Sequence, residues 1–377
     1  MLKIPHVARL TNNELILMGC GDVGPVHEPI ESYGVLARAT LATADVRFAQ
    51  VERVYSTRGS LQLHAGVGHS RVKPHMAAVF SDCAFNVVSL ASNHAMDWGV
   101  EALMDTLEVF DGRGIKTVGA GEDLQAARRP AILEAQGVKV AVLAYCSILN
   151  EGYAARPDRA GVAPLRVHTY YEAVENQPGV PPRIVTVPYQ EDLKAITDDI
   201  QAARKQADAV VVSLHWGIHH VPRLIAEYQP IAASAIFGAG ADLILGHHAH
   251  IPKAIEASGS KVCFYSLSNF IMSAAEKTPA QAAVWEKRHG AKLDPEYPRL
   301  PYGRDAKRSM IARAVFSREG LQRTSFLPAI IDKQLRPEVI RRSDPRFDDA
   351  VQYMQWASED FNHRFTIEGD EVIVTAP

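Results

Sequence analysis

Short runs of apolar, β-favouring residues recur along the chain, with helical patterns between them. Such runs are typical of strands buried on both faces of a sheet, and we expect them at residues 15–18, 85–90, 138–145, 209–214, 243–245 and 262–265. Apolar residues recur at helical spacing in residues 100–113 and 191–206, where we expect helices. The alternation of strand and helix favours an α/β core.

Two proline-containing stretches interrupt this alternation. Residues 150–190 read as an insertion, either a lid or a substrate loop, and residues 274–304 read as a second irregular stretch. A strand at 310–316 and a hairpin at 365–374 follow. We therefore expect a core of residues 1–275 with an insertion at about 150–190, and an extension of residues 276–377 that completes the same domain.

Length and composition suit a globular protein: 377 residues, 47% of them hydrophobic, can fill a large core. A net charge of -3 without a long basic run argues against a nucleic-acid partner. The four cysteines are dispersed beside apolar runs, as reduced buried thiols are. No apolar run reaches the roughly 18 residues of a membrane span, and the first residues lack the apolar region of a signal peptide. We expect a soluble, cytoplasmic chain.

Polar side chains gather where four of the predicted strands end. In chain order these are Asp22; Asn93, His94 and Asp97; His215; and His247, His248 and His250. Ligands of open α/β sheets collect at the carboxyl ends of the strands, so we expect these side chains to converge on one site. A mixture of oxygen and imidazole donors suits Mn²⁺, Zn²⁺ or Fe better than Mg²⁺ or Ca²⁺.

Five motifs lie within about residues 14–275: 21–23 (GDV), 89–99 (SLASNHAMDWG), 214–217 (LHWG), 240–250 (GADLILGHHAH) and 265–270 (YSLSNF). In order and spacing they resemble the CapA or poly-γ-glutamate capsule synthesis family. This family has the calcineurin-like metallophosphoesterase fold, so the resemblance implies a four-layer α/β/β/α sandwich.

The resemblance also implies roles for individual residues. Two divalent ions would be held by Asp22, Glu52, Asn93, His215, His248 and His250. His94 would assist the leaving group, and Asp97 either orients His94 or is only a carboxylate at a helix start. Asp22 has a plainer alternative as a turn residue. His247 falls where the wider superfamily often has glycine, so it is the least expected ligand of its cluster.

Two positions depart from the family pattern. Gln50 stands where an asparagine is expected, so the bridging position either rests on Glu52 or is weakened. His219 stands where a glutamate is common. We expect substrate contacts at Trp98, Trp216, His219, Asn269 and Arg156. The two tryptophans have an alternative role as packing walls, and Arg156 has one as a solvated loop residue.

Three functions remain open. The first is a metal-dependent hydrolase or transferase that acts on a phosphoester or on a γ-glutamyl or related peptide amide. The second is metal-independent acid/base epimerisation of a peptide, with Asp22, Asp97, His94 and a strand-end histidine as proton carriers; the departure at Gln50 motivates it. The third is a non-catalytic accessory of capsular polymer synthesis and export.

Overall fold

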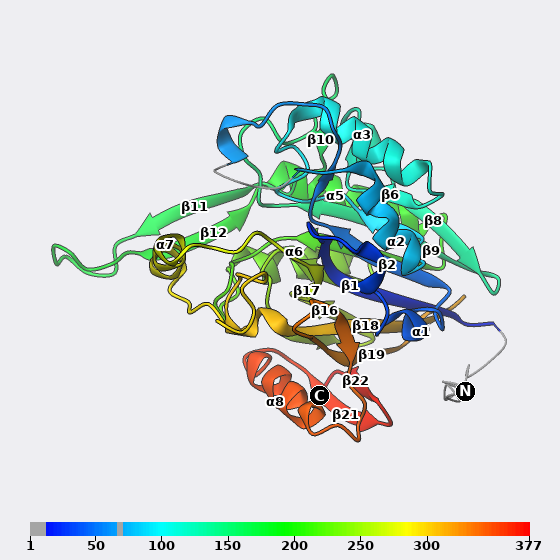
Figure 1. Ribbon diagram of the computed structural model, residues 1–377. Helices are drawn as coiled ribbons and strands as arrows, with labels where there is room; N and C mark the ends of the chain where they lie inside the picture. Colours follow the sequence, from blue (N-terminus) through cyan, green and yellow to red (C-terminus); the bar gives the residue numbers. More distant parts are fainter. Residues whose placement is uncertain (1–12, 66–70) are drawn as a thin grey trace.

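Two β-sheets packed face to face form the centre of the protein (Figure 1). The computed structural model describes residues 13–65 and 71–377. The expectation that a signal peptide is missing concerns the start of the chain, which lies outside the described residues. The first sheet has the strand order β21 (Arg364–Glu368), β22 (Glu371–Thr375), β19 (Gly320–Ile331), β18 (Arg308–Ser317), β1 (Leu15–Gly24), β2 (Val46–Val51), β5 (Val87–Ser89) and β6 (Lys116–Val118). Beside this path, β17 (Asn269–Met272) pairs with β1, and β20 (Pro337–Val339) pairs with β19.

The second sheet contains most of the strands predicted from long apolar runs. Its order is β15 (Ile255–Ser258), β16 (Lys261–Phe264), β14 (Leu243–His247), β13 (Ala209–His215), β9 (Val138–Cys146) and β8 (Ala131–Ala135). The strands β9, β13, β14 and β16 are parallel, so their carboxyl ends meet at one edge.

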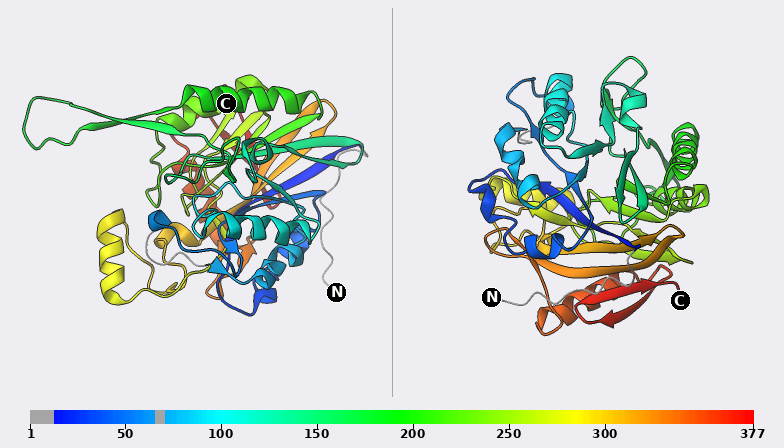
Figure 2. Two further views of the ribbon diagram at one scale, coloured as in Figure 1. Left: turned by 90° about the horizontal axis from the view of Figure 1, so that it is seen from above. Right: turned by 90° about the vertical axis from the view of Figure 1, so that its right-hand side faces the viewer.

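Helices cover the outer face of each sheet. The first sheet carries α2 (Ala78–Asp82) and α3 (Gly99–Asp111), and the second carries α5 (Gln190–Arg204) and α6 (Tyr228–Ala239). In Figure 2 the cyan α3 and the green α5 lie on opposite sides of the two sheets. One apolar core lies between the sheets and under α2 and α3, and a second lies under α5 and α6. The predicted α/β class with four layers is confirmed.

The remaining elements are short or lie at the periphery. They are α1 (Arg38–Leu41), β3 (Val54–Tyr55), β4 (Arg71–Val72), β7 (Ala120–Gly121), α4 (Leu124–Ala127), β10 (Gly161–Val162), β11 (Val167–Glu172), β12 (Arg183–Pro188), α7 (Pro279–His289) and α8 (Arg346–Ala357). The strand β18 pairs antiparallel with β1, which places a strand of the C-terminal hundred residues next to the first strand of the chain. Across the described ranges, no helix has the length and apolar character needed to cross a bilayer.

Both stretches expected to be irregular contain regular structure. Within 150–190, β11 and β12 form a hairpin that projects from the body of the molecule (Figure 1). Within 274–304, α7 begins with a capping box between Thr278 and Gln281, and Pro279 occupies its first turn. A proline is favourable there because it has no N–H to lose from the helix. The interpretation of Pro279 as part of an irregular stretch was therefore wrong.

Candidate metal centre

Two carboxylates lie at the carboxyl ends of β1 and β2, between the sheets. Asp22 sits at an irregularity of β1, where the parallel partner β17 replaces the antiparallel β18. Such irregularities redirect a side chain. Gly21 allows this crossing, since a Cβ there would lie 1.9 Å from the carbonyl oxygen of Ser268. Glu52 directly follows β2, and its N–H donates to the carbonyl of Val23 at 2.9 Å.

Both carboxylates are buried without adequate partners. Asp22 is 0% exposed and Glu52 is 1% exposed. Both oxygens of Asp22, and Oε1 of Glu52, lack a hydrogen bond within the described chain. Oε2 of Glu52 accepts one from Ser92 Oγ at 3.0 Å. Burial, and next the charge of Asp22, raises the pKa of Glu52 well above its usual value. Two buried acids in this state call for a cation.

Histidines from the second sheet face these acids. His215, at the end of β13, has Nε2 3.8 Å from Glu52 Oε2. His250 has Nδ1 3.2 Å from Asp22 Oδ2 and Nε2 3.8 Å from Glu52 Oε1. His248 Nδ1 lies 3.2 Å from His215 Nε2, and burial lowers the pKa of both His215 and His248. Burial therefore favours the neutral form of His215 and His248, which is the form that ligates metals.

His248 and His250 converge through the loop that follows β14, because that strand ends at His247. His248 and His250 have φ values of 86° and 58°, and this left-handed loop returns both rings to the site. Left-handed backbone is uncommon for residues with a Cβ, and such strain is often found at functional sites.

The donor set fits a divalent ion. One ligand atom each from Asp22, Glu52 and His215 lies within 4.8 Å of the others. Asn93 adjoins this group, because its Oδ1 is 2.7 Å from His215 Nε2. Carboxylate oxygens without hydrogen bonds, facing neutral imidazoles, match the ligands of Mn²⁺, Zn²⁺ or Fe. The arrangement is compatible with a metal ion, and we call Asp22, Glu52, Asn93, His215, His248 and His250 the central site.

The amide nitrogen of Gln50 is occupied by the backbone. Its Nε2 donates to the backbone carbonyls of Val51 and Ala91, at 3.1 and 3.2 Å. Its Oε1 is buried and has no hydrogen bond within the described residues. The amide nitrogen therefore supports the backbone at the end of β2, and Glu52 supplies the carboxylate of this segment.

A proton-transfer group stands beside the two acids. His94 Nδ1 is 2.7 Å from Asp97 Oδ2, and its Nε2 is 3.9 Å from Glu52 Oε1. Tyr153 donates to the other oxygen of Asp97 at 2.9 Å. Asp97 is an acceptor, so it holds the proton of His94 on Nδ1 and directs Nε2 to the site. Of the two interpretations of Asp97, the geometry favours the orienting one.

Several predicted substrate residues have structural partners instead. Trp216 is 1% exposed, donates from Nε1 to the carbonyl of Tyr265 at 3.0 Å and stacks on that ring, so its role is packing. Asn269 is fully buried, and its Oδ1 lies 2.8 Å from His250 Nδ1, so it positions a candidate ligand. Substrate contact by these two residues stays a prediction.

The other predicted substrate residues differ in location. Trp98 lies under the guanidinium of Arg71, 4.1 Å from the ring centroid. Arg156 lines a cavity of about 430 Å³ in which no central-site residue takes part. The His219 ring is tilted by 33° against that of His248 with ring centroids 3.8 Å apart, which places it beside the central site.

His247 lies closer to the acids than expected. Its Nδ1 is 3.7 Å from Asp22 Oδ1, its ring packs 5.7 Å from that of Phe48, and burial lowers its pKa to about 4. Neither ring nitrogen has a hydrogen bond within the described chain. The compact metal-ligand group around Asp22 nevertheless forms without His247.

Three contributors were missed by sequence reasoning. Tyr153 comes from the insertion, and no motif surrounds it. Tyr302 stacks on His250 with centroids 4.2 Å apart, and comes from the stretch interpreted as irregular. Arg53 is 4% exposed and donates to the carbonyl of Ser273 at 2.8 Å. Its position next to Glu52 was the one available signal.

The model of the bacterial capsule synthesis protein PGA_cap family matches residues 28–274, well over half of the chain. The chain belongs to this PGA_cap family. The match begins after Asp22, so the case for Asp22 rests on its geometry. The family resemblance inferred from the five stretches is confirmed.

Curated relatives are named for polymer biosynthesis. The chain is 33% identical over 204 residues to "PGA biosynthesis protein CapA" of Bacillus subtilis (strain 168), covering 54% of this chain and 47% of the relative. It is 31% identical over 209 residues to "Probable polyglutamine synthesis accessory protein" of Mycobacterium tuberculosis, covering 53% and 49%. The chain thus spans about half the length of these relatives.

Solved structures give weaker matches. A hypothetical protein from Thermus thermophilus matches with a TM-score of 0.46 at 14% identity, over 83% of this chain and 98% of that one. The calcineurin-like phosphoesterase YfkN from Bacillus subtilis matches with a TM-score of 0.42 at 11% identity, over 92% and 97%. Overlaps of this size transfer no function.

Proposed function

We propose that this PGA_cap protein is a metal-dependent hydrolase of capsular or poly-γ-glutamate polymer metabolism, acting on a phosphoester or a γ-glutamyl amide. One observation carries the proposal: Asp22 and Glu52 are buried together, with three carboxylate oxygens that lack hydrogen bonds within the described residues, opposite neutral imidazoles. Such a pair is costly in an empty protein and becomes favourable around a divalent ion.

The six central-site residues would hold the ions, with Glu52 central among them because its oxygens lie within 4 Å of His94, His215 and His250. When bound, divalent ions lower the pKa of a coordinated water and stabilise charge on the attacked centre. The protein excludes bulk solvent from this position, since Asp22, Glu52 and His215 are all buried.

His94 is the residue placed to protonate the leaving group. Its side chain is 21% exposed, more than any carboxylate beside it, so it borders the space that a substrate reaches. Burial lowers the pKa of His94, against the raising effect of Asp97. Asp97 and Tyr153 fix the ring and keep one proton on Nδ1. Nε2, which lies 3.0 Å from Asn93 Nδ2, has to take up a second proton before it can protonate the leaving group. This division makes His94 the general acid and Asp97 a positioning residue.

Metal-independent epimerisation has one observation in its favour. Gln50 directs its amide nitrogen to backbone carbonyls, so the segment after β2 gives one carboxylate to the site where the family pattern offers a second donor. The same site would then use His94, Asp97 and Asp22 as proton carriers. Solvent deuterium entering a peptide product in the presence of chelator would support this function.

The test compares the metal-free and reloaded protein. The chain is stripped with chelator, reloaded with Mn²⁺, Zn²⁺ or Fe²⁺, and assayed with a nitrophenyl phosphodiester and a γ-glutamyl anilide. We expect turnover of one substrate class that returns with metal, is lost in Asp22→Asn, and persists in Asp158→Asn, a change at an exposed aspartate. A protein that binds no metal would contradict the proposal. Metal binding without turnover of either class would support the accessory role instead.

A further inference from the structure

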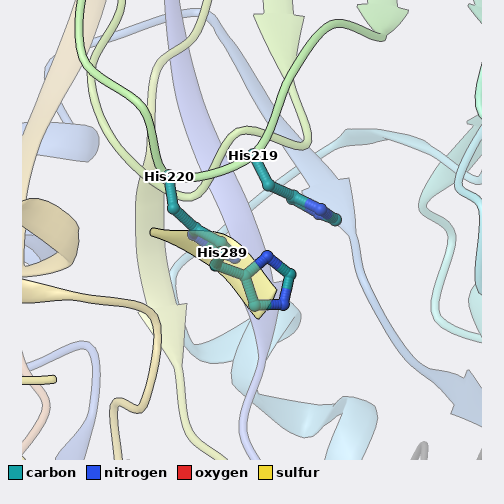
Figure 3. Close-up of side chains that lie close together, drawn as sticks. All are labelled: His219, His220 and His289. Carbon is teal, nitrogen blue, oxygen red and sulfur yellow. The ribbon is translucent and has the colours of Figure 1, made fainter. Parts of the chain in front are cut away.

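A second group of imidazoles lies beside the central site. His219 and His220 belong to the segment after β13, and His289 is the last residue of α7 (Figure 3). One nitrogen from each of the three side chains lies within 4.8 Å of the others. We call these residues the mouth cluster, because His219 and His289 are half-buried while the central acids are fully buried.

The rings of the mouth cluster approach from different directions. His219 and His220 are nearly parallel, with centroids 4.7 Å apart and an interplanar angle of 8°. His289 stands across both of them, at 80° to His219 and 84° to His220. A metal ion binds donors that approach it from different directions, which a single stack of rings does not provide. The ring of His289, which crosses the other two, supplies a second direction.

One nitrogen of the cluster has no hydrogen bond within the described residues. His220 is 7% exposed, and its Nδ1 has no hydrogen bond within the described chain. The residue also has a φ of 56°, in the left-handed region that side chains with a Cβ seldom adopt. A buried donor or acceptor without a partner costs about 1–3 kcal/mol. Pure ring packing does not explain why this side chain is a histidine.

We propose that the mouth cluster binds a zinc-class divalent ion through His219, His220 and His289, separate from the ions of the central site. Three imidazoles without a carboxylate favour Zn²⁺, Co²⁺, Ni²⁺ or Cu²⁺ over Mg²⁺ and Mn²⁺. Three protein ligands leave a fourth position for water or for an oxygen anion of a ligand.

The position of α7 gives this ion a structural consequence. No residue of α7 is buried, so the helix has little apolar contact to fix it. An ion held by His289 and the segment after β13 would tie the C-terminal end of α7 to the body of the protein. Trp285 on the same helix lies 4.7 Å from the His289 ring and 5.0 Å from the His220 ring, so it reports on the cluster.

The test counts Zn²⁺ bound to the full, untagged chain by equilibrium dialysis. His289→Gln changes a residue on a surface helix, and Arg288→Gln changes its exposed neighbour as a matched control. We expect His289→Gln to bind one Zn²⁺ fewer per chain than wild type, and Arg288→Gln to bind the wild-type number. Equal binding by wild type and His289→Gln would overturn the proposal.

A second variant separates this proposal from the proposed hydrolase. Asp22→Asn disables the central site but leaves the mouth cluster unchanged. This variant should therefore still bind the one Zn²⁺ per chain that His289→Gln loses, even if the central site binds nothing. Co²⁺ should quench tryptophan fluorescence in wild type and in Asp22→Asn, and this quenching should be lost in Trp285→Phe and in His289→Gln. Equal quenching in all four proteins would contradict a mouth ion.

Discussion

The central site and the mouth cluster are both rich in histidine, but they differ in charge and in what positions them. The central site combines two buried carboxylates with imidazoles, and Asp22, Glu52 and His215 lie at the ends of paired strands. The mouth cluster has imidazoles alone, on a loop and at the end of a helix without buried residues. Removing metal should therefore leave an electrostatic penalty in the central site and almost none at the mouth.

The largest expected effect tests this difference at Asp22. Asp22→Asn should weaken metal binding at the central site by more than about a hundredfold, because loss of even a partner behind a ligand costs about 10- to 100-fold. The metal-free variant should unfold at a higher temperature than metal-free wild type, because one of two repelling buried acids is gone. Calorimetry with and without chelator measures both. A lower unfolding temperature in chelator would show that the acids do not repel.

The next effect separates proton transfer from metal binding. His94→Gln should lower kcat by about 10²- to 10⁴-fold, the usual contribution of a positioned general acid. Its metal content should equal that of wild type, because His94 lies 3.9 Å from Glu52 and is not part of the compact ligand group. Loss of metal in His94→Gln would move this residue from the acid role to the ligand set.

A smaller effect is expected from a change at Gln50. It tests whether the central site depends on this departure from the family pattern. Gln50→Leu leaves two buried carbonyl groups without their donor. We expect a loss of about 1–3 kcal/mol in the free energy of unfolding, with unchanged metal stoichiometry. Denaturant unfolding and metal analysis measure these quantities. A variant of normal stability that binds one ion fewer would make Gln50 a ligand.

The smallest effect is a pH dependence of the folding stability that arises from Lys253. Lys253 donates to the carbonyls of Val221 and Leu224, and burial lowers its pKa to about 7. Above pH 7 the folded chain loses this proton while the unfolded chain keeps it, so stability rises with pH. From pH 7 to 8, wild type should gain about 1 kcal/mol relative to Lys253→Met. A flat difference between the two proteins would show that the ammonium is retained.

The same contrast explains what sequence could predict. Apolar runs located the strands, and the carboxyl ends of the strands located most central-site residues, because strand pairing brings such ends together. The interpretation of Asp22 as a turn residue was wrong, because β1 continues through Asp22 to Gly24. Residues contributed by the insertion and by the proline-rich stretch escaped prediction. Tyr153 reaches Asp97 from the insertion, and His289 reaches His220 from a helix that a capping box starts within a proline-rich stretch.

The most direct test of the central claim is an anomalous-scattering map from crystals grown without chelator in the presence of Mn²⁺ and Zn²⁺. We expect strong peaks within ligand distance of Asp22, Glu52 and His215, and a zinc-edge peak among His219, His220 and His289. No peak beside Asp22 and Glu52 at these metal concentrations would contradict the metal-dependent hydrolase.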